Sequence, residues 1–200
     1  MSESYIIQLS KAINTYASVP DDELIKFITV AHPVEVKKSE YFIKAGDLEP
    51  WLGFIISGVF RGFHVDDTGA EFTKHFFKEN DFMTANSRSL VDKDFVKKES
   101  DYYFQALEDS TVLKIDRVEQ RECLSHPCWQ EIFAKEIEHV HTIEERRIKQ
   151  LLLADAETRY FNFLQDFPGL EHRIKQSHIA SYVGVSPVSL SRIRTHIKSN

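Results

Sequence analysis

The sequence predicts an α+β protein in which an antiparallel β sandwich or barrel is followed by a long helix and a helix-turn-helix. Turn-bounded apolar runs fill residues 34–115, helical apolar spacing without Pro or Gly covers residues 128–153, and two short helical patterns flank a glycine in residues 177–197. With 200 residues, 42% of them hydrophobic, the chain can form one large domain, or a large and a small one. This composition excludes disordered, collagen-like and disulfide-scaffold proteins.

Two helices and a set of strands are expected before the long helix. Residues 3–17 place apolar side chains at helical spacing, and a second helix begins near Pro20 and ends before Pro33. No long helical pattern interrupts the apolar runs that follow, so their strands are antiparallel rather than part of an α/β sheet. The expected strands cover residues 34–36, 41–43, 54–56, 59–65, 72–77, 102–107 and 112–115.

Residues 128–153 are expected to form one helix about 38 Å long, at 1.5 Å per residue. A helix longer than its own domain commonly packs against a copy of itself, so we expect a dimerisation helix. Glu144 and Arg147 interrupt its apolar stripe, which leaves packing along the same chain as the alternative. A further helix is expected at residues 155–165.

Residues 176–197 have the pattern of a helix-turn-helix. Ser177 is expected to cap the first helix, Gly184 to supply the positive φ of the turn, and Ser186 with Pro187 to begin the second helix. Four positions carry the residue type that the crossing of two such helices requires. Counted from Gln176, they are Ala180 (fifth), Gly184 (ninth), Leu190 (fifteenth) and Ile193 (eighteenth).

The charge distribution indicates that the C-terminal part alone meets a polyanion. Residues 1–150 carry 19 basic and 27 acidic side chains, whereas residues 172–200 carry five basic side chains and no acidic one. A basic end can also be a merely solvated terminus, but together with the helix-turn-helix pattern it leads us to expect binding to double-stranded DNA. Arg192 is a candidate for reading guanine, with a phosphate contact as the alternative, and Val188 and Ser189 also stand near the start of the second helix. The expected DNA-binding residues are Ser177, His178, Ser186, Val188, Ser189, Arg192, Arg194, His196 and Lys198.

The order of these parts resembles the Crp/Fnr superfamily of bacterial transcription regulators. The resemblance rests on glycine turns at residues 46–47, 56–59, 68–69 and 80–82, and on residues 179–194; residues 156–160 make it similar to short regulators of the Bacteroidetes group. It implies an α+β fold with a cyclic-nucleotide-binding-like jelly-roll sensor domain at residues 1–126, a dimerisation helix at residues 127–153 and a helix-turn-helix domain at residues 154–200. It further implies a cytoplasmic homodimer that binds DNA, with RNA polymerase as a further candidate partner.

The sensor region departs from the nucleotide-binding members of this superfamily. After Phe82 no acidic residue stands where the family holds the ribose, and Ser100 is flanked by Glu99 and Asp101 where the family places an arginine for the cyclic phosphate. An acidic stretch repels phosphate, so no cofactor is predicted and a cyclic nucleotide is not expected. Another small-molecule effector stays open, with an anion site or a plain surface loop as the two interpretations of Asn86, Ser87 and Arg88.

Catalysis and metal binding are not expected. The sequence contains no nucleophile elbow, phosphate loop or zinc-protease pattern, and Cys123 and Cys128 are expected to be free thiols. His141 and Glu145 stand four residues apart but belong to a charged helix face, and His75 is expected to pack or face solvent. The chain lacks an apolar run long enough for a transmembrane helix and shows no secretory signal.

Only three residues follow Ile197, so the β-hairpin wing of the superfamily is expected to be absent. The alternative function is therefore a small-molecule-binding or dimerising module with weak or no DNA binding.

Overall fold

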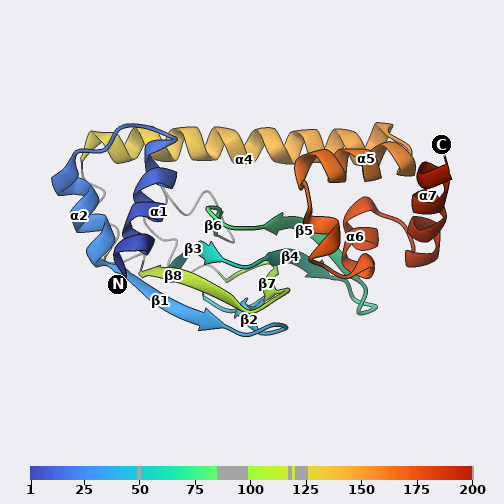
Figure 1. Ribbon diagram of the computed structural model, residues 1–200, viewed down its shortest axis with the longest axis horizontal. Helices are drawn as coiled ribbons and strands as arrows, with labels where there is room; N and C mark the ends of the chain where they lie inside the picture. The colour runs from blue at the N-terminus through green and yellow to red at the C-terminus, as the bar shows by residue number, and fades with distance from the viewer. Residues whose placement is uncertain (49–50, 85–98, 117–118, 120–125, 200) are drawn as a thin grey trace. The chain divides into compact units, whose positions relative to one another are not determined.

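The computed structural model describes residues 1–48, 51–84, 99–116, 119 and 126–199 (Figure 1). The chain forms two compact units. The first contains Met1–Gly62 and Phe76–His141, and the second contains Phe63–His75 and Thr142–Asn200. A long helix and a β hairpin each contribute residues to both units.

The strands form two four-stranded antiparallel sheets, as the sequence predicts. One sheet has the order β1-β8-β3-β6 and the other the order β2-β7-β4-β5. Seven of these strands coincide with predicted ones, and β6, only two residues long, was not predicted. The strands are β1 (Ala31–Val36), β2 (Tyr41–Ile43), β3 (Trp51–Ser57), β4 (Phe60–Val65), β5 (Glu71–Phe77), β6 (Phe82–Met83), β7 (Tyr103–Ala106) and β8 (Ser110–Asp116).

Strand β1 begins at Ala31, earlier than the predicted start at residue 34, and contains Pro33. Pro33 stands opposite Leu113 of β8. Proline lacks the N–H that a central strand needs, but β1 is an edge strand and pairs only with β8 in its sheet. Pro33 is therefore tolerated inside β1, because β1 lies at the edge of its sheet.

One turn in the first unit requires glycine. Gly58, between β3 and β4, has φ +107°, and a Cβ at this position would collide with the side chain and backbone of Ser110. Glycine alone combines this backbone conformation with so close an approach of β8. Gly58 therefore ends β3, as its turn sequence predicts, and also allows β8 to pack closely against the turn.

Two apolar clusters stabilise the first unit. One lies between the two sheets and contains Phe60, Met83 and Phe104. The other joins the first sheet to helices α1 (Glu3–Asn14) and α2 (Asp21–Thr29) and to the start of α4 (Pro127–Leu153), and it is centred on buried Phe54 and Trp129. The Trp129 ring stacks on Phe27 of α2 with 4.8 Å between ring centroids.

A buried polar contact fixes α2 against α4. The indole Nε1 of Trp129 donates a hydrogen bond of 3.2 Å to Glu23 Oε2. Glu23 also pairs with Lys26, and these bonds lower the pKa of its carboxyl despite burial. Glu23 is only 6% exposed, so the two donors to its carboxylate compensate the cost of removing it from water.

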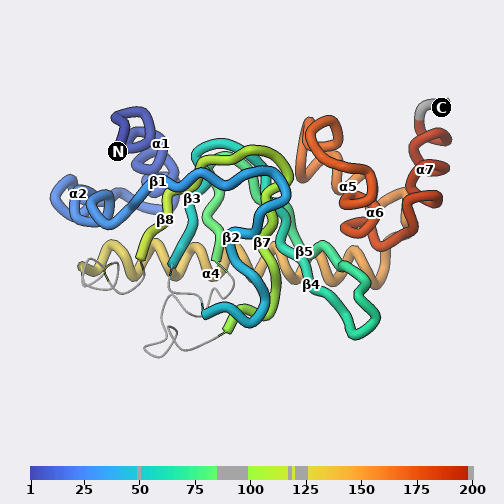
Figure 2. Tube along the Cα trace, turned by 90° about the horizontal axis from the view of Figure 1, so that it is seen from below, coloured from blue at the N-terminus to red at the C-terminus, as the bar shows by residue number. Residues whose placement is uncertain are grey.

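The second unit is helical apart from the tip of the β4–β5 hairpin. The predicted long helix is confirmed as α4, which has 27 residues. It is followed by α5 (Ala156–Asp166), a short 3₁₀ helix η3 (Leu170–His172), α6 (Gln176–Val183) and α7 (Pro187–Ser199). Figure 2 shows α5 and α6 side by side. Between them, Phe163, Phe167 and Tyr182 form an aromatic cluster with ring centroids 5.6–5.8 Å apart.

Candidate nucleic-acid interface

Helices α6 and α7 are joined by a tight turn at Gly184. Gly184 has φ +76°, in the left-handed region, and its N–H donates to the carbonyl of Ala180 at 2.9 Å. Val185 N–H bonds to the same carbonyl at 3.0 Å, which closes the end of α6. The predicted turn at Gly184 is therefore confirmed.

The crossing of α6 and α7 buries the residues that the spacing singled out. Ala180 is fully buried, Leu190 is 1% exposed and Ile193 is half-buried. Ile179 and Val183 of α6 are also fully buried. A larger side chain at Ala180 would push the helices apart, because protein cores hold few voids.

The two helix starts differ from each other. Ser186 caps α7, since its Oγ accepts a hydrogen bond of 3.1 Å from the backbone N–H of Ser189, as predicted. The cap predicted for α6 is wrong: the N-cap residue is Lys175, without a side-chain cap bond, and Ser177 lies inside the helix. Helix α6 begins at Gln176, earlier than predicted, and the Ser177 side chain is exposed.

One face of α7 is exposed along its length. Val188, Arg192 and His196 follow each other at four-residue intervals, and all three are exposed. Val188 is 63% exposed. At 1.5 Å per residue the three side chains extend over about 12 Å of the helix. The face presents an apolar group, a guanidinium and an imidazole in a row.

The other predicted contact residues lie around this face. Ser189 is half-buried, and its hydroxyl is 2.9 Å from that of Ser186, so the cap already uses part of its hydrogen-bonding capacity. Arg194 and His178 are half-buried, and Ser177 and Ser186 are exposed. The Lys198 side chain lies outside the described part of the chain.

Two arginines that the sequence analysis did not select as site residues hold the end of α6. Arg159 of α5 donates from Nε to the Val183 carbonyl at 2.7 Å and from NH1 to the Ala154 carbonyl at 2.6 Å. Arg147 of α4 donates from NH2 to the Tyr182 carbonyl. Cations at the C-terminus of a helix stabilise its dipole and its unpaired carbonyls. Arg147 interrupts the apolar stripe of α4, and this interruption is the one signal in the sequence that could have indicated it.

The tip of the β4–β5 hairpin is hydrogen-bonded to α6. Ser181 Oγ donates to the Glu71 carbonyl at 2.8 Å and accepts from the backbone N–H of Thr73 at 2.9 Å. Nearby, Lys74 pairs with Glu144 of α4 at 2.7 Å, and the His75 ring packs edge-on against Phe167. The hairpin is thus part of the second unit, and sequence spacing could not indicate a contact between residues about 110 positions apart.

The candidate ligand residues Asn86, Ser87 and Arg88 lie outside the described residues, as does Cys123. Ser100 is buried. Its Oγ donates to the Tyr102 carbonyl at 2.6 Å, and its backbone bonds to Gly46 and Asp47. Ser100 therefore joins two segments of the chain through its own hydrogen bonds.

Two further findings concern residues 1–48, 51–84, 99–116, 119 and 126–199. Within these ranges, no three His, Cys, Asp or Glu side chains are grouped so that they could hold a metal ion. In the same ranges, no helix has the length and apolar character needed to cross a bilayer.

Comparison with solved structures finds regulators of gene expression. The c-di-GMP-responsive global regulator CLP of Xanthomonas campestris matches with a TM-score of 0.72 and 14% identity, over 90% of this chain and 92% of that one. FixK2 of Bradyrhizobium japonicum matches with a TM-score of 0.72 and 15% identity, over 85% of each chain. A transcriptional regulator assigned to the Crp/Fnr family from Eubacterium rectale matches with a TM-score of 0.71 and 15% identity, over 94% and 88%.

The chain has the fold of Crp/Fnr regulators. The resemblance inferred from the glycine turns and residues 179–194 is thereby confirmed at the level of the fold. Comparison of the sequence finds no matching family model and no significant match among curated proteins. Within this Crp/Fnr fold, α6 and α7 form the candidate interface.

Proposed function

We propose that the chain is a homodimeric, DNA-binding transcription regulator of the Crp/Fnr type. The observation that carries the proposal is the exposed face of α7, on which Val188 and Arg192 stand next to a capped helix start. This face belongs to the part of the chain that carries five basic side chains and no acidic one from residue 172 onward. Likeness to regulators over most of the chain supports the same conclusion.

The proposal divides the chain into three functional parts. Residues 1–126 are a jelly-roll sensor domain, residues 127–153 a dimerisation helix, and residues 154–200 a helix-turn-helix domain without a full wing. The hydrogen bonds of Ser181 with the β4–β5 hairpin give the sensor region a direct connection to α6. A ligand-induced change in the sheet would therefore reach the DNA-binding helices through this hairpin.

In the proposed complex, α7 enters the major groove of DNA. Arg192 reads a guanine through O6 and N7, and Val188 contacts a thymine methyl group. Ser189, which lies next to the Ser186 cap, adds a contact to a base or to a phosphate. The remaining predicted residues hold phosphates and fix the register: Ser177, His178, Ser186, Arg194, His196 and Lys198.

Dimerisation is proposed through the C-terminal turns of α4. Ile148 and Leu152 stand one turn apart and are 58% and 75% exposed, and Leu153 is 77% exposed. Three large apolar side chains so near each other on one helix end are costly in water and favour burial against a second copy. A dimer would hold two α7 helices about 34 Å apart, the spacing of successive major grooves.

The sensor domain is proposed to work without the cyclic-nucleotide contacts of the superfamily. The Ser100 hydroxyl bonds to the backbone, and its neighbours Glu99 and Asp101 carry negative charge where a phosphate would stand. An anion at Asn86, Ser87 and Arg88 remains the alternative ligand hypothesis.

The test is selection of DNA from a random library, followed by titration of the selected duplex at several salt concentrations. We expect an enriched two-fold symmetric site, and at least tenfold weaker binding for Arg192→Ala with relaxed preference at one base pair per half-site. Lys11→Ala, which removes one positive charge from α1, is the matched control and keeps full affinity.

The outcomes separate the possible roles of Arg192. A lower salt dependence without a change in base preference would mean that Arg192 contacts phosphate. Unchanged affinity and preference would contradict any DNA contact by this residue. If no sequence is enriched even at low salt, the DNA-binding proposal fails and a dimerising or ligand-binding module replaces it.

A further inference from the structure

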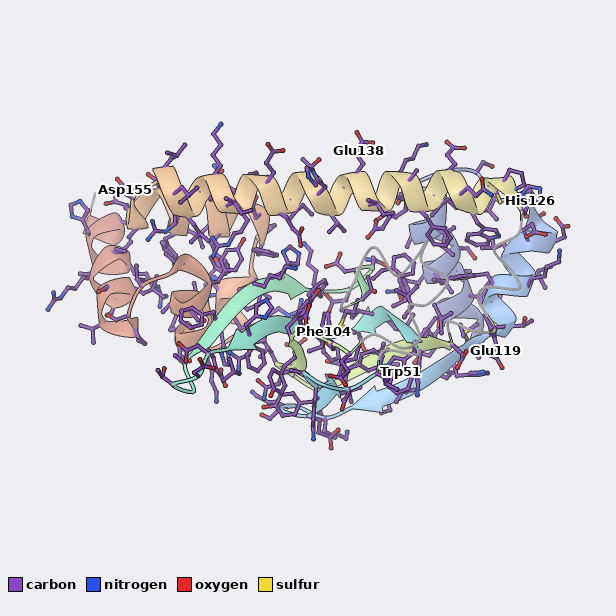
Figure 3. The ribbon with its side chains drawn as sticks, turned by 180° about the vertical axis from the view of Figure 1, so that it is seen from behind. Trp51, Phe104, Glu119, His126, Glu138 and Asp155 are labelled. Atoms are coloured by element: carbon purple, nitrogen blue, oxygen red, sulfur yellow. The ribbon has the colours of Figure 1, made fainter. Side chains whose placement is uncertain are left out.

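One exposed stripe of α4 has the spacing of a coiled-coil seam. Its residues alternate in steps of four and three, and every one of them is exposed. Figure 3 shows Glu138 of this stripe on the side of α4 that is turned away from the sheets. The residues of this seam are Ala134, Glu138, His141, Glu145, Ile148 and Leu152. Ile148 and Leu152, through which dimerisation is proposed, are thus the apolar end of a longer pattern whose other half is acidic.

The inference rests on the proposed dimerisation through α4. Both helix-turn-helix domains must lie at the same end of the dimer to contact one DNA duplex, so the two α4 helices run parallel. In a parallel pair, each seam position faces the same position of the second copy. Glu138 therefore faces the partner's Glu138, and His141 faces the partner's His141. The two facing carboxylates repel each other and oppose association unless a cation lies between them.

Glu138 and His141 have the spacing of two ligands of one metal ion. Side chains three positions apart on a helix are neighbours, with about 5–6 Å between their Cβ atoms, and Glu-x-x-His pairs on facing helices hold metal ions in helix bundles. A single chain does not complete such a site, because its described residues contain no group of three His, Cys, Asp or Glu side chains that could hold a metal ion. A second copy doubles the pair to two carboxylates and two imidazoles, which is a full tetrahedral ligand set.

We propose that two copies of α4 bind one Zn²⁺ ion between them through Glu138 and His141 of each chain. Imidazole nitrogen and carboxylate oxygen are ligands that suit zinc, whereas Mg²⁺ and Ca²⁺ prefer sites made of oxygen alone. The ion turns the repulsion between the two glutamates into attraction. Zinc binding and dimerisation therefore strengthen each other, and zinc acts as an effector at the dimer helix rather than in the sensor domain.

The test uses the full-length protein after removal of metal ions with a chelator, and the probe is ZnCl₂. Sedimentation equilibrium measures the dissociation constant of the dimer. We expect ZnCl₂ to lower this constant at least tenfold, and MgCl₂ or CaCl₂ at the same concentration to leave it unchanged. Calorimetric titration should give one zinc ion per two chains, and one zinc ion per single chain would contradict a site shared by two copies.

Two variants of the ligand pair give opposite effects with and without metal. Glu138→Gln keeps the shape of the side chain and removes its charge. Without metal its dimer should be at least as stable as that of the unchanged protein, because the repulsion is gone, but ZnCl₂ should no longer strengthen it. His141→Ala should also lose the response to ZnCl₂. A purely structural role of Glu138 would not produce this reversal.

The same helix offers a matched control for each variant. Glu131→Gln removes the same charge seven positions before Glu138, at the equivalent position of the preceding heptad. Its ion pair with Lys135 is exposed, so this loss costs little stability. His139→Ala removes an exposed imidazole that stands beside the seam rather than in it. Both control variants should keep the full response to ZnCl₂.

The outcomes separate failure of the zinc site from failure of dimerisation. A dimer with the same dissociation constant with and without ZnCl₂ overturns the zinc site and leaves dimerisation intact. A chain that stays monomeric at every concentration, with or without ZnCl₂, contradicts dimerisation and the zinc site together. An undiminished response to ZnCl₂ in Glu138→Gln or His141→Ala means that the ion binds elsewhere, and this result also overturns the proposal.

Discussion

The guanidinium of Arg147 lies over the ring of Tyr182, with 3.8 Å between its central carbon and the ring centroid. The same guanidinium donates to the Tyr182 carbonyl, and burial lowers its pKa. Its NH1 atom is buried without a partner among the described residues. Because Arg147 belongs to α4 and Tyr182 to α6, this contact connects the proposed dimerisation helix to the proposed DNA-binding helices.

Replacement of Arg147 by alanine should destabilise the second unit by about 2–3 kcal/mol. The change removes a buried charge-assisted hydrogen bond and a cation–π contact, and it leaves the Tyr182 carbonyl without its donor. Denaturant unfolding measures the loss of stability, and hydrogen exchange should show faster opening of α6.

The adjacent arginine is a matched control for this prediction. Arg146 pairs with Asp166 at 3.1 Å, but its side chain is 55% exposed. Exposed ion pairs contribute about 0–1 kcal/mol, so Arg146→Ala should have a much smaller effect. Similar losses of stability for the two variants would mean that the stacking of Arg147 on Tyr182 stabilises the protein no more than an exposed ion pair does.

The backbone at Gly184 leads to a second prediction. Gly184→Ala should cost about 1–2 kcal/mol, because φ +76° is unfavourable for a residue with a Cβ. The new methyl itself meets only Leu151 at an ordinary 3.5 Å, so strain rather than collision causes the loss. Gly184→Asn should be tolerated better, since asparagine adopts this conformation more readily. Thermal unfolding of both variants checks the order, and equal losses would exclude backbone strain as the cause.

Much of this architecture could be predicted because it is encoded locally. The turn at Gly184, the cap at Ser186 and the burial of Leu190 each depend on residues within a few positions of one another. Local hydrogen bonding and helical periodicity dictate such features. The start of α6 was predicted less well, because a serine inside the first turn resembles a cap in sequence.

Contacts between distant segments could not be predicted in the same way. The pair of hydrogen bonds between Ser181 and the β4–β5 hairpin joins residues about 110 positions apart, and no periodicity relates them. Arg147 appeared only as a defect in an apolar stripe. The apolar cluster around Phe54 and Trp129 combines residues from three helices and the first sheet, so only the folded chain brings them together.

A third prediction concerns the hairpin contact. Ser181→Ala removes the acceptor of the Thr73 amide and the donor to the Glu71 carbonyl, and should cost about 1 kcal/mol. The Thr73 amide should then exchange with solvent distinctly faster. Ser177→Ala changes an exposed serine of the same helix and should leave this exchange rate unchanged. Equal acceleration by the two variants would mean that α6 is generally loosened rather than released from the hairpin.

The carboxyl of Asp81 has an unusual acidity that makes stability depend on pH. Burial raises its pKa from 3.8 to about 6, and the nearby charges of Glu136 and Glu79 act in the same direction. The backbone N–H of Lys78, which donates to Asp81 Oδ2 at 2.8 Å, and the Lys78 charge oppose this shift only in part. Since the folded pKa lies above the unfolded one, the folded state binds the proton more tightly. Asp81 therefore favours folding at low pH and opposes it as the pH rises from about 4 to about 6.

Asp81→Asn should accordingly stabilise the protein at pH 8 by roughly 3 kcal/mol and have little effect at pH 4. The amide oxygen of asparagine can still accept the hydrogen bond from Lys78, so the turn before β6 is preserved. Denaturant unfolding across this pH range measures the difference between the two proteins. Asp67→Asn, at an exposed position in the β4–β5 hairpin, should follow the unchanged protein at every pH. A constant difference between Asp81→Asn and the unchanged protein would show that the carboxyl does not titrate in this range, because only a titrating group makes the difference grow with pH.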